Sequence, residues 1–447
     1  MAYLIESRLK HSGMTNFSSF RIISMDDSTI LKKIDSGIRF FLYLLIFWLP
    51  YSKAVVESSV VIALVLWIVK RGLILRRFHA IDKKKLLRMC APAGSFLNGP
   101  ITIFLIFGMV SALTSTLFLQ SLHGYLTKIL EWFIIYFLIL EVFTTKKHIR
   151  IAFIIFLFTS ISTVLDSLQQ FYWTHKDIFL GYVVHDNRAT GGFNHSNDLA
   201  GYLTFVIPVV MVHPFWNKNS MGKFFLGMVL TVLSVWSLVV TFSRGAWLAV
   251  AAGVFFFLCF VGRSWRPFII LGIMAFILGT GIFFTTNKKE FRVDAHDVHH
   301  TVHWRYDLWE DSLKMILNRP NFGYGPNTFM PTFFDFGRAI RGGGYYTPTY
   351  AHNCFIQLAA EMGIFGLGSF LWIVGLLFQK VIVQLKNLKA GDYNLKILST
   401  GMLGGTLAFL GHSFVDTNLF SLQLSALFWM MVGLQVAVYN LQKSSIS

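Results

Sequence analysis

The chain has 447 residues, of which 55% are hydrophobic and only 14% are charged, and phenylalanine alone occurs 46 times. This composition excludes an ordinary soluble domain, which needs a polar surface, and it indicates a protein that lies in an apolar solvent. The net charge of +17 is compatible with nucleic-acid binding, but the basic residues cluster between apolar runs. We therefore predict membrane lipids, and no nucleic acid, as partners.

Apolar runs long enough to cross a bilayer recur along most of the chain, separated by short clusters of Lys, Arg, Gly, Asn or Pro. The expected spans are 38–52, 54–70, 99–118, 126–144, 151–172, 199–214, 224–241, 246–262, 267–286, 363–385, 397–415 and 420–441. A spanning segment must satisfy its own backbone hydrogen bonds, which a helix does. The runs therefore predict an all-α polytopic membrane protein with about twelve transmembrane helices.

The basic residues also predict an orientation, because cytoplasmic loops carry an excess of Lys and Arg. With the N-terminus inside, 26 of the 39 Lys and Arg residues fall on the inner side, and the short outer loops hold only five. The expected divisions are an inner N-terminal tail (1–37), spans one to nine (38–286), an outer loop (287–362), spans ten to twelve (363–441) and an inner C-terminal tail (442–447). No removable signal peptide is expected.

Two outer segments are longer than the other connections, 174–198 and 287–362, and function is expected to concentrate there. The second predicts a small folded cap, since 304–317 and 352–362 have apolar residues at helical spacing. Gly and Pro in 318–327 and 341–344 break regular structure. We expect them to let a ligand approach the backbone.

Arg244 lies where two apolar runs meet at the outer boundary of the predicted membrane. Holding a guanidinium at such a position costs on the order of 1–3 kcal/mol. One interpretation is an anion site, because the guanidinium fork matches phosphate oxygens and Gly245 leaves the backbone open beside it. The alternative is an Arg that reaches the lipid head groups.

Two further arginines lie in the outer segments. Arg188 begins a polar, glycine-containing stretch that suits a phosphate or a sugar, although Asn197 and Asp198 within it are equally compatible with helix caps. Arg305 lies on the predicted helix 304–317, and by itself it is also compatible with a solvated helix face.

His352 and Asn353 stand at the start of the predicted helix 352–362. A neutral imidazole there can take a proton from a hydroxyl group as a general base, and the alternative is a histidine that caps the helix or packs at an interface. His412 and Asp416 lie near the outer end of span eleven. They either line a cavity or pair with each other at their four-residue spacing.

A group of acidic and histidine side chains follows the ninth span. It consists of Asp294, His296, Asp297, His299, His300 and His303. Their irregular spacing fits no tight ligand pattern, so we predict a solvated loop and no metal site. The three cysteines are too few and too scattered for a disulfide framework. The chain also has no Asp-x-Asp pair, through which a divalent ion usually holds a sugar-nucleotide diphosphate.

Four segments carry a resemblance, and they are Phe242–Ala249, Arg305–Ile316, Pro320–Phe329 and Ala351–Leu358. Together, in their order and spacing, they resemble the O-antigen ligase and polymerase superfamily of bacterial envelope glycosyltransferases. The resemblance extends from about Arg188 to Asp416. It implies a GT-C-like membrane fold with a large periplasmic loop between helices nine and ten.

The resemblance also implies an activity: transfer of a glycan from undecaprenyl diphosphate to a hydroxyl acceptor, with inversion, at the periplasmic face of the inner membrane. No metal and no soluble cofactor are implied. Arg244 and Arg305, assisted by Arg188, would bind the diphosphate, and His352 would be the general base. The supporting candidates are Asn353, Gly245, His412 and Asp416.

Within the family, the single cap and the lack of a large extra C-terminal domain favour a ligase that uses lipid A–core oligosaccharide as acceptor. A polymerase that extends the glycan on its lipid carrier is the first alternative. A twelve-helix transporter would share the composition, but transporters place polar groups near the bilayer midplane in repeated halves. Here the Arg and His candidates gather at one outer boundary.

Overall fold

The computed structural model describes residues 25–77, 94–178, 181, 183, 188–212, 221–260, 295–336, 349–387 and 393–444. This part of the chain is helical and contains no β-sheet, with one isolated antiparallel bridge between Lys176 and Val183. The predicted all-α class is therefore confirmed for the residues that the structure describes. The ninth predicted span, 267–286, lies outside them.

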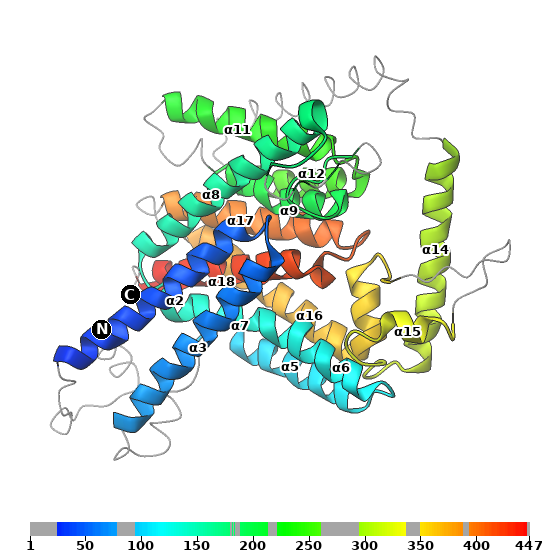
Figure 1. Ribbon diagram of the computed structural model, residues 1–447, viewed down its shortest axis with the longest axis horizontal. Coiled ribbons are helices and arrows are strands. Elements are labelled where there is room, and N and C mark those ends of the chain that lie inside the picture. Colours follow the sequence, from blue (N-terminus) through cyan, green and yellow to red (C-terminus); the bar gives the residue numbers. More distant parts are fainter. Residues whose placement is uncertain are drawn as a thin grey trace.

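Each of the other predicted spans overlaps a helix. The helices of the bundle are α2 (Met25–Trp48), α3 (Lys53–Arg77), α5 (Asn98–Leu113), α6 (Phe118–Tyr125), η1 (Leu126–Leu130), α7 (Glu131–Val142), α8 (Lys146–Gln169), η2 (Gln170–Thr174), α9 (Ser196–Val210), α11 (Met221–Val239), α12 (Arg244–Phe260), α16 (Cys354–Asn387), α17 (Tyr393–His412), η4 (Asn418–Phe420) and α18 (Leu422–Ser444). Figure 1 shows them side by side, with α18 inside the bundle.

Four helices of the described residues are long and apolar enough to cross a membrane. They are Lys53–Arg76, Lys146–Thr174, Cys354–Asn387 and Leu422–Lys443. Shorter apolar helices accompany them at Asn98–Leu113, Phe224–Val239 and Arg244–Phe260. An all-α membrane protein agrees with these lengths, whereas the number of twelve spans stays a prediction.

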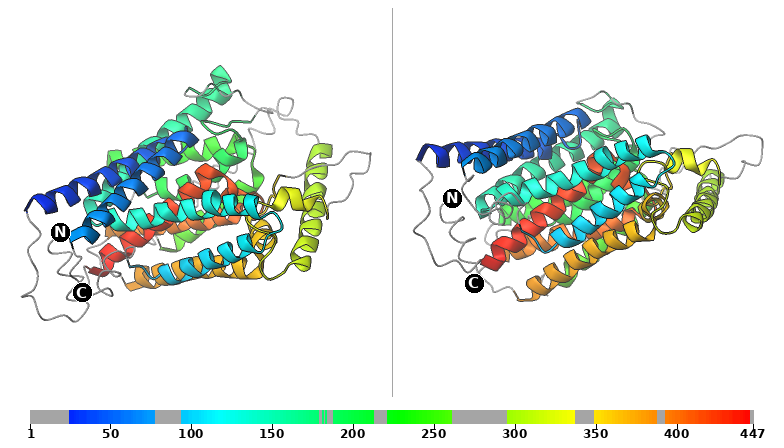
Figure 2. Two further views of the ribbon diagram at one scale, coloured as in Figure 1. Left: turned by 60° about the horizontal axis from the view of Figure 1, so that its bottom comes forward. Right: turned by 90° about the horizontal axis from the view of Figure 1, so that it is seen from below.

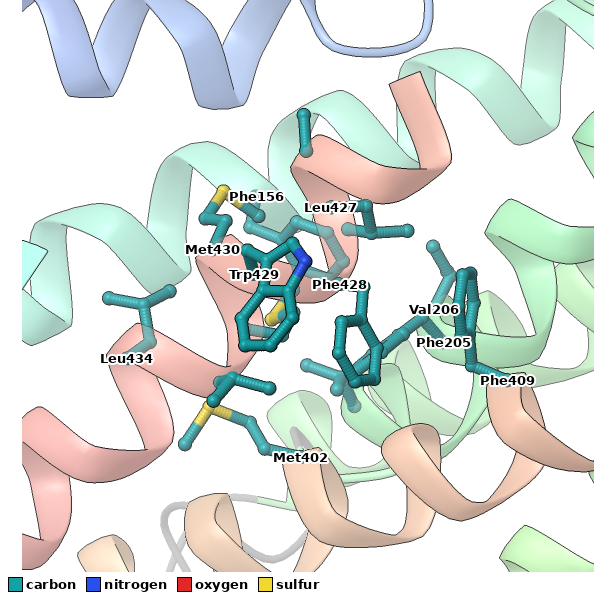
Figure 3. Close-up of a cluster of buried hydrophobic side chains, with 14 of the residues drawn as sticks. Phe156, Phe205, Val206, Met402, Phe409, Leu427, Phe428, Trp429, Met430 and Leu434 are labelled. Atoms are coloured by element: carbon teal, nitrogen blue, oxygen red, sulfur yellow. The ribbon is translucent and has the colours of Figure 1, made fainter. Parts of the chain in front are cut away.

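Aromatic side chains fill the space around α18. Phe428 lies beside Phe409 of α17, with ring centroids 5.6 Å apart, and Phe409 in turn lies 5.7 Å from Phe205 of α9 (Figure 3). Small residues let α12 approach α17 closely, because a Cβ on Gly253 of α12 would come within 2.5 Å of the Gly404 carbonyl oxygen of α17. Close approach at small residues is typical of helix packing in membranes.

A smaller unit covers one end of the bundle. Helix α14 (Ala295–Asn318) lies across that end, opposite the start of α2 and the end of α18 (Figure 2). It packs through Leu308 and Met315 onto a small apolar cluster that includes Phe329 of the short helix α15 (Phe329–Phe333). The predicted helix 304–317 lies within α14. The predicted helix 352–362 corresponds to the first part of α16, which Gly363, with φ 67° and ψ −173°, interrupts directly afterwards.

The glycine-rich turn between α14 and α15 differs from the expectation for 318–327. Gly323 has φ 69°, and a Cβ there would meet the backbone of Glu361 at 2.5 Å, while a Cβ on Gly325 would collide with Ser115 and Ser121. The backbone therefore approaches α16 and the α5–α6 corner instead of an open ligand site. The other glycine-rich stretch, 341–344, lies outside the described residues.

Candidate active site

The predicted site residues come from helices far apart in the sequence and meet at the turn that joins α17 to α18. We call residues 412–418 of this turn the junction. The starts of α12 and α16 both contact it, and α14 lies next to the start of α16.

His352 faces the junction directly. Its Nδ1 atom lies 3.8 Å from Oδ1 of Asp416, and the two side chains are 31% and 12% exposed. This separation is an electrostatic contact, too long for a hydrogen bond. The Trp304 ring of α14 packs edge-on against the imidazole, with centroids 5.3 Å apart. The imidazole is thus partly exposed, with Asp416 and the Trp304 ring beside it.

Local backbone geometry explains how His352 reaches this position. It has a positive φ of 48°, which turns the chain just before α16. Asn353 is the N-terminal cap of that helix, because its Oδ1 accepts hydrogen bonds from the backbone N–H groups of Phe355 (2.9 Å) and Ile356 (3.1 Å). Cys354 then ties the helix to the junction, donating from its backbone N–H to the Ser413 carbonyl (2.9 Å) and from its thiol to the Asp416 carbonyl (3.3 Å).

Asp416 lies between α17 and η4, outside the apolar spans. Burial by itself would raise the pKa of its carboxyl, but contact with the His352 imidazole, the electrostatic effect of His412 and a hydrogen bond from the Thr417 backbone N–H outweigh burial and hold this pKa below its usual range. Asp198, in the first turn of α9, has its pKa raised by burial and by repulsion from Asp416. At neutral pH Asp416 is therefore the ionised carboxylate beside His352.

His412 is buried and makes contacts of its own. Its Nε2 lies 3.2 Å from Ser243 Oγ, and its Nδ1 lies 3.1 Å from Asn418 Nδ2. Both ring nitrogens thus face neutral groups, and the pairing with Asp416 that the four-residue spacing allows is not how these nitrogens are used. His412 fixes the position of Ser243 and does not present its ring to a reactant.

Arg244 is the first residue of α12 and is exposed. Its two neighbours both pack on the junction, Ser243 through His412 and Gly245 through Val415. A Cβ on Gly245 would collide with the Val415 side chain, so packing of the helix start explains this glycine, instead of the open backbone that we expected. The result is a guanidinium that projects from a firmly held helix start at the edge of the junction.

Arg188 contacts the turn before α12 and the start of α9. Its Nε donates to the Thr241 carbonyl (2.7 Å) and a terminal nitrogen donates to Oδ1 of Asn197 (2.6 Å). Asn197 is therefore a partner of Arg188, whereas His195 occupies the N-cap position of α9. These bonds connect the start of α9 to the α11–α12 turn, so Arg188 braces the turn that carries Arg244.

Arg305 lies on α14, next to Trp304. Its Nε is buried and has no hydrogen-bond partner among the described residues, and its charge acts on His412. A buried guanidinium N–H without a partner is expensive, and an anion would satisfy it. Arg244, Arg305 and the His352–Asp416 pair therefore lie around the junction. Arg188 does not contact the junction in the same way, because it bonds to Thr241 and Asn197 behind Arg244.

The residues weighed as a metal cluster are only partly described. Asp294 lies outside the described range, and of the histidines only His303 has a described side chain, which is exposed. Where the structure describes side chains, no group of three or more His, Cys, Asp or Glu residues is placed to hold a metal ion.

Two ionisable residues, Lys128 (half-buried) and Glu361 (buried), were not singled out from the sequence. Lys128 lies on the π-helical turn η1, and Glu361 is 4% exposed in α16, where it faces the glycine-rich turn. The signal for both was present, because each is a charge inside an otherwise apolar run, where ionisable groups are expensive and need a partner.

Comparison with known proteins points in one direction. Residues 229–371 match the family described as O-antigen ligase, a region that contains Arg244, Arg305 and His352. An O-antigen ligase of Salmonella typhimurium strain LT2 is 24% identical over 235 residues, which are 48% of this chain and 53% of that protein. The alignment thus spans about half the length of this relative. Both findings agree with the resemblance that the four sequence segments indicated.

Proposed function

Because the chain is similar to the O-antigen ligases over the region that holds its candidate site, we propose that it is a glycosyltransferase of that type. In this proposal it transfers a polysaccharide from undecaprenyl diphosphate to a hydroxyl of lipid A–core oligosaccharide in lipopolysaccharide biosynthesis. The observation that carries the proposal is the His352–Asp416 pair at the junction, beside Arg244 and Arg305.

The guanidinium groups act on the donor. When the bond between the anomeric carbon and the diphosphate oxygen breaks, negative charge grows on the departing undecaprenyl diphosphate. Fixed positive groups in a poorly hydrated site stabilise this charge more than bulk water does. The unpartnered Nε of Arg305 and the exposed guanidinium of Arg244 suit this role, and no metal ion is needed for it. Arg188 assists by bracing Arg244.

The imidazole acts on the acceptor. His352 takes the proton of the attacking hydroxyl while the acceptor oxygen bonds to the anomeric carbon from the side opposite the diphosphate, which inverts the configuration. The carboxylate of Asp416, 3.8 Å away, stabilises the imidazolium that forms. His412 and Gly245 support the site by packing, and Asn353 supports it by capping α16.

The membrane arrangement in this proposal follows the distribution of charge. The site faces the periplasm, both termini are cytoplasmic, and the loop 287–362 forms a cap over the outer end of about twelve spans in the inner membrane. The position of α14 across one end of the bundle, away from the start of α2 and the end of α18, supports this orientation (Figure 2).

One reconstitution tests the ligase against the polymerase alternative. The purified protein in liposomes receives a lipid-linked glycan, with or without lipid A–core acceptor. Glycan on lipid A–core, formed only when that acceptor is present, supports the ligase. Longer glycan on the carrier lipid in the absence of acceptor would make the protein a polymerase. No product with either, from a folded protein, would contradict both and favour a transporter.

A further inference from the structure

A partly open cavity lies next to the candidate site, between α5, α7, α16 and α18. Its walls are mainly apolar and include Phe104, Phe133, Phe370 and Trp429. Cys354 also lines it, and the thiol of Cys354 donates a hydrogen bond to the Asp416 carbonyl. The cavity and the His352–Asp416 pair are therefore separated by the first residue of α16.

The ammonium group of Lys128 belongs to the lining of this cavity. The Lys128 ammonium donates to Oδ1 of Asn327 (2.8 Å) and lies 3.5 Å from the Tyr350 hydroxyl, with the Tyr350 ring centroid 5.6 Å away. All of these partners are neutral. Among the described residues, no carboxylate lies within ion-pair distance of Lys128.

The carboxylate of Glu361 also lines the cavity, but its oxygens are already occupied. They accept hydrogen bonds from the backbone N–H groups of Asn327 (2.9 Å) and Phe329 (3.3 Å), and from the Gln357 amide (3.2 Å). Its oxygens are thus used to hold the glycine-rich turn. Lys128 therefore keeps the capacity to bind an anion.

The backbone around Lys128 is also unusual. It lies in η1, a single π-helical turn between α6 and α7, and such turns are rare and often occur at functional sites. A lysine inside an apolar span is expensive unless it meets an anion or a polar cluster. Lys128 lines the aromatic cavity, whereas Arg188, Arg244 and Arg305 are not among its lining residues.

We propose that Lys128, with Tyr350 and Asn327, binds the phosphate group of a lipid whose apolar chain enters the cavity lined by Phe104, Phe133, Phe370 and Trp429. A compact ammonium with neutral hydrogen-bonding neighbours suits a phosphate oxygen, and the aromatic walls suit a hydrocarbon chain. The proposed function names two sources of this chemistry, the polyprenyl carrier and a phosphorylated glycolipid acceptor. To that extent the inference rests on the proposed function.

Lipid binding to the purified full chain tests the assignment, with native mass spectrometry as the readout. The probes are undecaprenyl phosphate and lipid A, each compared with its dephosphorylated form. Lys128→Gln should weaken binding of a phosphorylated lipid by about tenfold or more and leave the dephosphorylated form unchanged. Lys128→Arg should retain most of the affinity, and Lys380→Gln, which removes an exposed cation elsewhere, should bind like the wild type.

The lipid that shows the Lys128 dependence identifies the source. Equal binding of both phosphorylated lipids by wild type and Lys128→Gln would overturn the site, as would an equal loss in Lys380→Gln, which would indicate surface charge only. If Lys128→Gln does not fold, Tyr350→Phe decides, because it keeps the ring and should weaken phosphate-dependent binding by about threefold. Unchanged affinity in that variant would also overturn the site.

The outcome is distinguishable from that of the proposed function. Arg244→Ala should abolish transfer, and in the Arg244→Ala background Lys128→Gln should still weaken phosphate-dependent binding by the same factor. Conversely, absence of glycan transfer to any acceptor would not alter the binding measurement.

Discussion

The carboxylate of Glu361 accepts a hydrogen bond from the backbone N–H of Asn327 at 2.9 Å, and through it a residue near the start of α16 holds the glycine-rich turn between α14 and α15. Asn327 has a positive φ of 61°, so the turn needs this support. The same α16 segment begins with His352 and Cys354 at the junction. Fixing the turn therefore also fixes the cap beside the candidate site.

Glu361→Gln should destabilise the protein. The amide keeps one acceptor oxygen but replaces the other with a donor that faces a backbone N–H, so we expect a loss of about 1–3 kcal/mol in the free energy of unfolding. Thermal melting in detergent measures it. Glu57→Gln, on the exposed side of α3, is the matched control and should change stability by less than about 0.5 kcal/mol. Equal melting of the two variants would refute the role of Glu361.

Gly363→Ala should be destabilising because φ at this position is 67° and a Cβ would collide with the backbone of Asn321. With ψ at −173°, this backbone lies in a region that essentially only glycine occupies, which costs an alanine about 1–3 kcal/mol, and the collision adds to that. Gly368→Ala in the same helix is the control, since nothing lies within 4 Å of its Cβ position. It should be neutral or slightly stabilising. Comparable melting temperatures for both variants would contradict the packing described for the turn.

Helices and their order could be predicted from the sequence because long apolar runs have a single stable form in a bilayer. The convergence of Arg244, Arg305 and His352 could be expected only through the resemblance, since no spacing links residues more than forty positions apart. Contacts made by tertiary packing were not predictable. Lys70 is one of the 26 basic residues assigned to the inner side, and the structure buries it against Asp35 and Glu141.

The glycines show why sequence alone misjudged part of the site. Gly245 and Gly325 were expected to expose backbone to a ligand, but each accommodates a neighbouring side chain, Val415 in one case and Ser121 in the other. A glycine that permits close approach has the same sequence signal whether a ligand or another helix approaches. Only the folded structure distinguishes the two.

Arg244→Ala, Arg305→Ala and His352→Ala should each abolish glycan transfer while the protein still inserts and accumulates. Loss of a fixed positive charge at the departing diphosphate is expected to lower the rate by about 10²–10³. Arg150 is exposed near the start of α8, and the Arg150→Ala variant should transfer glycan normally. The readout is O-antigen on lipopolysaccharide in cells that carry each variant alone. Normal lipopolysaccharide in all three variants would end the mechanistic proposal.

Chelation of divalent ions should leave transfer unchanged in a purified assay. The proposed mechanism stabilises the diphosphate with guanidinium groups and has no step that requires a metal. The measurement compares the initial rate with and without EDTA. A loss that Mg²⁺, Mn²⁺ or Zn²⁺ restores would instead make the residues from Asp294 to His303 candidates for a metal site.

Asp416→Asn should lower both stability and activity, with a defined dependence on pH. The carboxyl has a lowered pKa in the folded protein, so its ionised form stabilises the fold above the ordinary Asp value of about 3.9. That contribution is lost as the pH falls through the lowered folded value. The stability difference between wild type and Asp416→Asn should therefore be present at pH 5 and shrink as the pH falls below about 4.

Activity should respond to the same substitution for a different reason. The amide is neutral and cannot stabilise the imidazolium that His352 forms when it takes the acceptor proton, so at neutral pH we expect transfer to fall by about 10²-fold or more. Asp198→Asn is a useful comparison, because this residue lies near Asp416 but not against His352, and it should lose much less. Wild-type rates in Asp416→Asn, from a protein with unchanged melting at pH 7, would show that the 3.8 Å contact has no part in the reaction.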